Sequence, residues 1–185
     1  MLFRSATPKK ESNIISYVDA VQLKNEHMVK LPVIVYNRDS QAEVLTDAID
    51  LRNKLEEIAN AEYAKTGKYI RPIALFQAQP KGKEDATTFE KLRDKLVDAG
   101  IPADQIAIRT ADVNELKNVE LMSPNCPIRY IITVNALKEG WDCPFAYILA
   151  SLANKTSQVD VEQILGRILR LPHTSQHTQS ALNMS

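Results

Sequence analysis

Short, wholly apolar runs recur along the chain, separated by longer stretches in which apolar positions recur at helical intervals. Apolar runs rich in β-branched and aromatic residues predict strands that are buried on both faces, as in a parallel sheet. Residues 14–23 have this composition and are expected to be extended, with a turn at residues 24–27. The other predicted strands are residues 33–36, 73–76, 106–108, 130–134 and 147–150.

Two amphipathic stretches between these runs carry helix-capping signals. Ser40 and Glu43 have the spacing of a capping box, and Gly67 is the expected end of the helix that follows. Thr87 and Glu90 repeat the spacing before a second helix, which is expected to close at Gly100. The positions expected to face the core are Val44, Ala48, Leu51, Leu55 and Ile58 in the first helix and Phe89, Leu92 and Leu96 in the second.

The end of the chain predicts a third helix and a polar tail. The helix is expected to start near residue 157. After Pro172 the composition turns polar, so residues 174–185 are expected to form a frayed end. Strands that alternate with helices in this way indicate an α/β fold with a mostly parallel sheet.

Composition narrows the classes of function. The 185 residues are 44% hydrophobic and 25% charged, which is the balance of a globular protein with a core and excludes wholesale disorder. A formal net charge of zero excludes a generally basic surface that coats nucleic acid, although it allows a local basic patch. No apolar window approaches the length that a membrane span needs.

The cysteines and the first residues of the chain indicate the cellular compartment of the protein. Cys126 and Cys143 are too few for a disulfide framework and fit a reducing environment. Because the first residues also lack a charged-then-apolar leader, we expect a cytoplasmic location. His173 and His177 lie four apart, but the two cysteines are too far apart in the sequence for a zinc knuckle, so no metal site is expected.

The predicted third helix has two different faces. A glycine inside a helix costs about 1 kcal/mol relative to alanine, and two arginines one turn apart repel each other unless an anion binds them. A solvated polar face remains the ordinary explanation of a polar stripe. The apolar stripe is Val161, Ile164, Leu165 and Ile168, and the opposite stripe is Gln163, Gly166, Arg167 and Arg170.

The same helix and the strand before it resemble a known family. Residues 163–170, Q-I-L-G-R-I-L-R, resemble motif VI (Q-x-x-G-R-x-x-R) of superfamily-two helicases. Residues 133–142, T-V-N-A-L-K-E-G-W-D, resemble motif V, and the strand that ends at Gln77 is similar to motif IV. Residues 5–7, S-A-T, resemble motif III. Residues 130–170 are most similar to the Res (restriction) subunit of type III restriction-modification enzymes.

The resemblance implies a RecA-like fold of the P-loop NTPase type. In it, this chain would supply the helicase C-terminal domain, which has no P-loop of its own. Residues 1–12 would be the tail end of a first RecA-like domain that carries motif III. Residues 13–173 would be the second RecA-like domain, with motifs IV, V and VI, and residues 174–185 a polar, truncated C-terminal end.

The motifs that bind ATP directly are not found in the sequence. A phosphate-binding loop needs G-K followed by Ser or Thr, whereas the two G-K pairs are followed by Tyr69 and Glu84. No Asp-Glu pair follows an apolar strand to hold magnesium. We therefore expect ATP and Mg²⁺ to be held mainly by the missing first domain, and this chain alone to be inactive.

The resemblance also implies roles in nucleotide chemistry. In this family the second RecA-like domain closes over ATP that is bound on the first. By resemblance, Arg167 and Arg170 are arginine fingers that reach the γ-phosphate, and Gln163 orients water or phosphate. Gly166 would permit the close approach of the nucleotide.

A second group of residues would face DNA or connect it to the nucleotide. By resemblance, Gly140 and Asp142 couple the two sites, although Asp142 could instead be an ordinary helix or turn cap. DNA contacts in the family are largely to the phosphodiester backbone. Thr133, Asn135 and Lys138 are the candidates, through hydroxyl, amide and ammonium donors.

The expected function is therefore that of the second motor domain of an ATP-dependent DNA translocase. The partners that the resemblance implies are the N-terminal RecA-like domain of the same polypeptide, double-stranded DNA and a modification (methyltransferase) subunit. Another superfamily-two helicase, acting on RNA or branched DNA, would carry similar motifs. A non-catalytic α/β module that binds an anion or a partner protein through Arg167 and Arg170 is the alternative from a different class.

Overall fold

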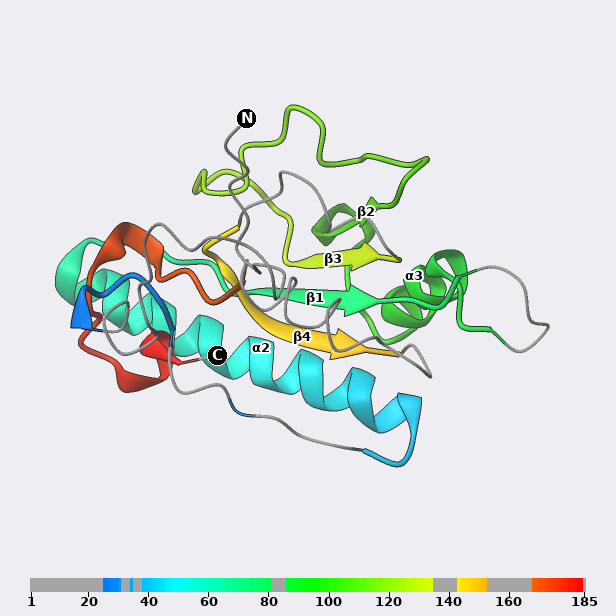
Figure 1. Ribbon diagram of the computed structural model, residues 1–185, viewed down its shortest axis with the longest axis horizontal. Helices are drawn as coiled ribbons and strands as arrows, with labels where there is room; N and C mark the ends of the chain where they lie inside the picture. The colour runs from blue at the N-terminus through cyan, green and yellow to red at the C-terminus, as the bar shows by residue number, and fades with distance from the viewer. Residues whose placement is uncertain are drawn as a thin grey trace, which may run out of the picture.

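The computed structural model describes residues 25–30, 34, 38–80, 86–134, 143–152 and 168–184. Within them, four strands form one sheet in the order β2-β3-β1-β4, and every neighbouring pair is parallel. The arrowheads in Figure 1 accordingly all point the same way. The α/β class with a parallel sheet is thus confirmed. The strands are β1 (Ile73–Gln77), β2 (Ile106–Arg109), β3 (Tyr130–Thr133) and β4 (Ala146–Ser151).

The apolar runs form the strands because both of their faces are covered. Every residue of β1 and β3 is buried, so neither strand shows the in-and-out alternation of a sheet with one wet face. The predicted strand 130–134 ends one residue early, at Thr133, and β4 extends the predicted run by one residue at each end. The fully buried centre of the core includes Ile73, Leu75, Phe76, Ile131 and Ile132.

The long helix α2 (Gln41–Thr66) begins and ends where the capping signals predict. The Ser40 hydroxyl accepts a hydrogen bond from the Glu43 amide, and Gly67 adopts a left-handed φ of 70° that ends the helix. The predicted apolar face is wrong at Leu51, which is 40% exposed. Two of the buried residues of α2 are charged. The buried residues are Ala48, Arg52, Leu55, Ala59 and Glu62.

The second helix, α3 (Phe89–Asp98), starts one residue later than its capping signal predicts. Thr88, rather than Thr87, accepts a hydrogen bond from the amide three residues on, at Lys91. Thr87 is buried, and its hydroxyl donates to Gln41 Oε1 at 2.7 Å, so it is not free to cap the helix. Gly100 lies just beyond the helix, with φ 89°.

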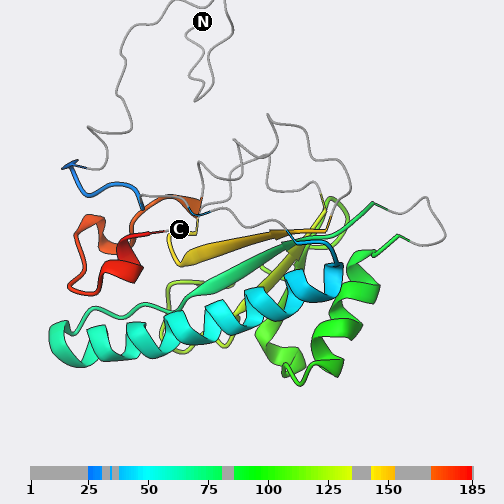
Figure 2. The same cartoon turned by 90° about the horizontal axis from the view of Figure 1, so that it is seen from below.

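Helices α2 and α3 lie on the same side of the sheet (Figure 2). Helix α2 packs against β4 and β1, and α3 packs against β3. A short 3₁₀ turn, η1 (Ala103–Gln105), leads into β2. Each helix in the described ranges is too short or too polar to cross a membrane.

The prediction of a frayed C-terminal end is wrong for the described residues up to 184. Two 3₁₀ turns, η3 (Pro172–Thr174) and η4 (Ser180–Asn183), follow the ladder at residue 170. Leu182 is fully buried and His177 is 3% exposed. The polar composition suggested fraying because the pattern places Glu62 of α2 in solvent, whereas two backbone amides and one hydroxyl of this segment donate to its buried carboxylate.

Several predictions concern residues outside the described ranges. These are the extended segment 14–23, motif III at residues 5–7 and the start of the third helix near residue 157. Of the predicted strand 33–36, only Ile34 is described, and it is not in a strand.

Candidate functional site at the carboxyl edge of the sheet

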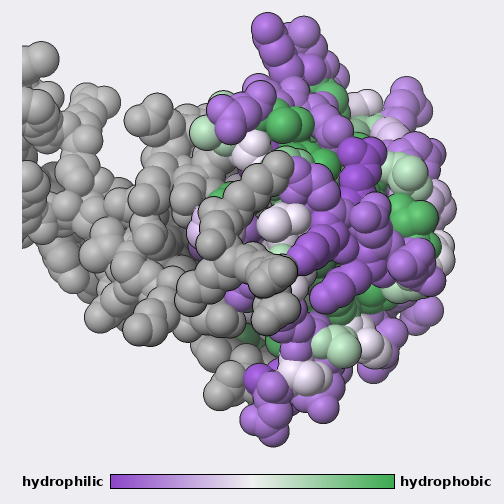
Figure 3. Space-filling view, turned by 90° about the vertical axis from the view of Figure 1, so that its right-hand side faces the viewer, coloured by the Kyte–Doolittle hydropathy of each residue, from purple (hydrophilic) through white to green (hydrophobic). Residues whose placement is uncertain are grey.

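The four strands end in register. Arg109, Thr133, Gln77 and Ser151 are the last residues of β2, β3, β1 and β4, and each is paired with its neighbour across the sheet. The carboxyl edge of a parallel sheet is where α/β proteins bind their ligands. Figure 3 looks onto this edge, and its described part is mostly hydrophilic, with hydrophobic residues in separate patches.

Gln77 is the polar centre of this edge. Its side-chain Oε1 accepts a hydrogen bond from the Ser151 hydroxyl at 2.9 Å, and its backbone oxygen accepts one from the Leu152 amide at 2.9 Å. On the other side, the Ala78 amide donates to the Thr133 carbonyl oxygen at 2.8 Å. The ends of β4, β1 and β3 are therefore fixed relative to one another, as a preorganised site requires.

A second set of hydrogen bonds joins this edge to the start of α2. The Thr87 amide donates to Gln79 Oε1 at 2.8 Å, and the Gln79 amide donates to the Thr87 carbonyl at 2.9 Å. Gln41, the first residue of α2, accepts from the Thr87 hydroxyl and donates through Nε2 to the Leu152 carbonyl at 3.4 Å. The chain that leaves β1 is thus tied to both the helix and β4.

Thr133 is the only predicted DNA contact that lies in the described ranges. It sits at the end of β3, as predicted, but it is 1% exposed. Its hydroxyl has no hydrogen-bond partner among the described residues. A buried, unpaired hydroxyl is unfavourable, and such groups recur at functional sites. To reach a phosphate, this hydroxyl would need the chain around it to move.

Arg170 is the only predicted nucleotide contact in the described ranges, and it lies away from Thr133. Its backbone forms an antiparallel bridge with Val29. The Lys30 amide donates to the Leu169 carbonyl at 2.5 Å, and the Leu171 amide donates to the Met28 carbonyl at 3.0 Å. Residues 28–30 and 169–171 therefore form a short ladder, and the Arg170 side chain is exposed.

The buried side chain of Lys30 anchors this ladder to the first residues of β4. Its ammonium donates to the Pro144 carbonyl at 3.2 Å and to the Ala146 carbonyl, and it lies 4.0 Å from the centre of the Tyr147 ring. The ladder thus stands at the amino end of β4, and Thr133 stands at the carboxyl edge. The structure does not bring Arg170 and Thr133 together, and the sequence assigned them to different ligands.

The remaining predicted site residues lie outside the described ranges. In the sequence, those of motif V follow the last residues of β3, and those of motif VI fall between the residues of β4 and those of the ladder. These residues are Asn135, Lys138, Gly140, Asp142, Gln163, Gly166 and Arg167.

The described residues include one fully buried cysteine and no cluster of possible metal ligands. Cys143 is fully buried, and this burial raises the pKa of its thiol to about 11, so it stays protonated at neutral pH. Across the described ranges, no group of three or more His, Cys, Asp or Glu side chains could hold a metal ion.

Sequence reasoning did not find Lys30, Gln79 or Gln41. Lys30 looks like an ordinary surface lysine before an apolar run, Gln41 looks like a solvent-facing residue at a helix start, and Gln79 looks like part of a loop after a strand. Lys30 and Gln41 acquire their roles from distant parts of the chain, Lys30 from Pro144 and Gln41 from Thr87 and Leu152, whereas Gln79 bonds to Thr87, eight residues on. No spacing in the sequence signals the distant pairs.

Comparisons with known proteins give no further assignment. No family model matches the chain, and no curated protein or solved structure shows a significant match to it.

Proposed function

We propose that this chain is the second RecA-like domain of an ATP-dependent DNA translocase of helicase superfamily two, most similar to the Res subunit of type III restriction enzymes. The observation that carries the proposal is the order and spacing of two motifs. Motif V begins at Thr133, the last residue of β3, and motif VI follows β4 in the chain. The all-parallel sheet supports this assignment because β3 ends at its carboxyl edge, which is where parallel sheets bind ligands.

The proposed chemistry is transition-state stabilisation from a neighbouring domain. During ATP cleavage, negative charge redistributes over the γ-phosphate oxygens, and a guanidinium fixed beside them lowers the barrier. An arginine finger of this kind accelerates phosphoryl transfer by about a thousandfold or more. Arg167 and Arg170 take this role in the proposal, with Gln163 orienting water or phosphate and Gly166 allowing close approach.

The proposed DNA contacts are to phosphates, which suits a motor that must ignore sequence. Asn135 and Lys138 directly follow the carboxyl edge of β3 in the chain, and Thr133 lies on it. Gly140 and Asp142 would couple this contact to the nucleotide. In the parent protein, ATP and Mg²⁺ would be held mainly by the first RecA-like domain, and a nuclease domain and a methyltransferase subunit would complete the enzyme.

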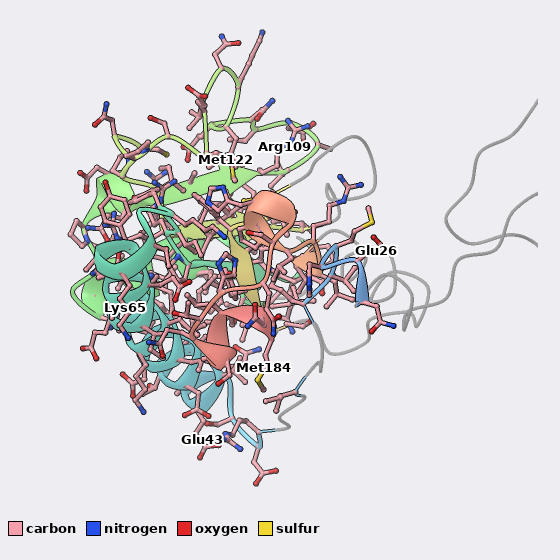
Figure 4. All side chains as sticks on the ribbon, turned by 90° about the vertical axis from the view of Figure 1, so that its left-hand side faces the viewer. Glu26, Glu43, Lys65, Arg109, Met122 and Met184 are labelled. Atoms are coloured by element: carbon pink, nitrogen blue, oxygen red, sulfur yellow. The ribbon has the colours of Figure 1, made fainter. Side chains whose placement is uncertain are left out.

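The salt dependence of DNA binding tests this proposal against an anion-binding module. We would measure the anisotropy of a labelled DNA duplex with the wild-type chain and with Lys138→Ala. Each lost phosphate contact reduces the slope of log K against log salt by about 1. The control is Lys65→Ala, because Lys65, labelled in Figure 4, is exposed in the last turn of α2, whereas the first residue of that helix, Gln41, is the one bonded to the carboxyl edge.

The two readings predict different results. A translocase domain binds DNA with a steep salt dependence, which Lys138→Ala makes shallower and Lys65→Ala leaves unchanged. If DNA binding is absent, or equal in both variants, and inorganic phosphate binds instead, the anion-binding module is the better description. Binding to RNA in preference to DNA would favour another superfamily-two helicase.

A further inference from the structure

The last described residues bond to α2 through one buried carboxylate. Glu62, on α2, is fully buried. Its Oε1 accepts a hydrogen bond from the Thr178 amide at 2.9 Å, and its Oε2 accepts one from the Gln179 amide at 3.2 Å and one from the Thr178 hydroxyl. We call residues 175–184 the C-terminal strap. Figure 4 shows the strap, with Met184 labelled, lying against α2.

His177 lies beside this carboxylate in an unusual environment. Its Nδ1 is 3.8 Å from Glu62 Oε1, and neither ring nitrogen has a hydrogen-bond partner among the described residues. The backbone around the ring is fixed, because Asn183 accepts from the His177 amide and donates to its carbonyl, both at 2.9 Å. The imidazole therefore gains water and hydrogen bonds only if the strap moves away.

Three other polar groups face this cluster. Lys68, just after α2, donates through Nζ to the Ser175 hydroxyl at 2.8 Å. The His173 ring centre lies 6.4 Å from that of His177. From β4, the Tyr147 hydroxyl donates to the Leu182 carbonyl at 3.1 Å. A proton added to His177 is thus attracted by Glu62 and repelled by Lys68, and by His173 when that ring is charged.

We propose that the C-terminal strap is an acid-releasable latch, in which protonation of His177, and at lower pH of Glu62, detaches residues 175–184 from α2 and β4 while the sheet stays folded. The strap is held by hydrogen bonds to Glu62, Lys68 and Tyr147 and by the buried side chain of Leu182, and none of these contacts belongs to the ladder of the sheet. Segments held in this way open separately from the core. Release uncovers the Tyr147 side chain and the Glu62 face of α2.

The direction of the pH effect follows from the environment of each group. Burial lowers the pKa of His177, Lys68 and His173 add to this, and Glu62 and the Pro172 backbone oppose it without reversing it. Burial alone would raise the pKa of Glu62, but the hydrogen bonds from Thr178 and Gln179 hold it below its ordinary value. The docked strap therefore binds fewer protons than the released strap, so acid favours release. The His177 effect begins below about pH 6.5 and the Glu62 effect below about pH 4.5.

Amide hydrogen exchange measures the opening of the strap directly. The reporters are the Thr178 and Gln179 amides, which bond to Glu62, and the references are amides in the sheet, at Leu75 and Ile131. Rates are measured by NMR from about pH 8 to about pH 5 and corrected for the intrinsic pH dependence of exchange. We expect the opening constant of the strap to rise by up to about tenfold per pH unit below about pH 6.5, and the sheet amides to stay unchanged.

His177→Phe removes the titrating group and keeps a ring of similar shape. In this variant the opening constant should be flat down to about pH 5. The control is His27→Asn, because His27 is exposed and has a φ of 54°, which asparagine tolerates. It should keep the wild-type dependence. Glu62→Gln should raise the opening constant at neutral pH, since an amide nitrogen cannot accept the strap hydrogen bonds.

The proposal is overturned by any of three results. The wild-type strap could open equally at all pH values, His177→Phe could keep the dependence, or the sheet amides could open with the same dependence as the strap. If His177→Phe does not fold, the ¹³C resonance of His177 in the wild-type protein replaces it. Its titration must then coincide with strap opening, and a titration at the ordinary pKa without opening refutes the latch.

Discussion

Replacing Arg71 with methionine should be among the most destabilising single changes in the described part of the chain. The guanidinium is 1% exposed and lies just before β1. It donates to the Ile128 and Ser123 carbonyls, both at 2.8 Å, and to the Leu121 carbonyl. It therefore holds the segment that leads into β3. Methionine fills much of the same space but makes none of these bonds.

The magnitude follows from the contacts. A hydrogen bond to a charged group contributes about 1.5–3 kcal/mol, so three carbonyl contacts contribute roughly 4.5–9 kcal/mol in gross terms. Removing the guanidinium also removes the cost of burying a charge, which is several kcal/mol. The net loss should be about 3 kcal/mol, which corresponds to a fall in Tm of about 6–12 °C for a chain of this size. Arg71→Lys should lose less, since an ammonium can still donate to one or two carbonyls.

Urea unfolding followed by circular dichroism measures this loss. The matched control is Arg93→Met, because Arg93 forms an ion pair with Glu115 at 3.1 Å in which the two side chains are 35% and 37% exposed. Exposed pairs contribute about 1 kcal/mol or less. If Arg71→Met loses no more stability than Arg93→Met, the argument that Arg71 organises the approach to β3 is wrong.

Four further predictions use the same structure. Cys143, whose thiol pKa is raised to about 11 by burial, should react with a thiol reagent at about pH 8 only after unfolding, and prompt reaction in the native state would contradict its burial. Thr133→Val should leave Tm unchanged or raise it, because the hydroxyl has no described partner, and a loss above about 1 kcal/mol would reveal one. Gly67→Ala should cost about 1 kcal/mol in urea unfolding, since φ is 70° and nothing within 4 Å obstructs a Cβ. Lys30→Met should weaken the ladder by about 2 kcal/mol, seen as faster exchange of the Leu171 amide, and unchanged exchange would show that the anchor is dispensable.

The strands and the helix ends were predictable because their signals are local. A wholly apolar run such as residues 73–76 is stable as a strand only if both of its faces are covered. Every residue of β1 is buried, so this condition is met. Ser40 and Gly67 act through neighbours three or four residues away, so their spacing alone predicts the limits of α2. The capping error at Thr87 arose because a competing partner, Gln41, comes from a distant part of the chain.

The buried charges were not predictable from the pattern. Arg52 and Glu62 lie on the buried face of α2. The hydrophobic periodicity predicted that Leu51 would face the core, but its side chain is exposed. Glu62 is tolerated there because Thr178 and Gln179, more than a hundred residues later, donate to it. The same long-range pairing orders a tail whose composition suggested fraying. Of the candidate site, the sequence placed Thr133 at a strand end, but its burial depends on packing that no motif encodes.

The most direct test of the central claim is a DNA-stimulated ATPase assay on this chain mixed with the first RecA-like domain of the parent protein. The account predicts that hydrolysis appears only with both parts, and that Arg167→Ala lowers it by about a thousandfold or more without changing the folded state. If the two parts associate and fold but Arg167→Ala hydrolyses ATP at the wild-type rate, the polar stripe predicted from Gln163 to Arg170 is an ordinary solvated face. The proposed motor function of these arginines is then contradicted.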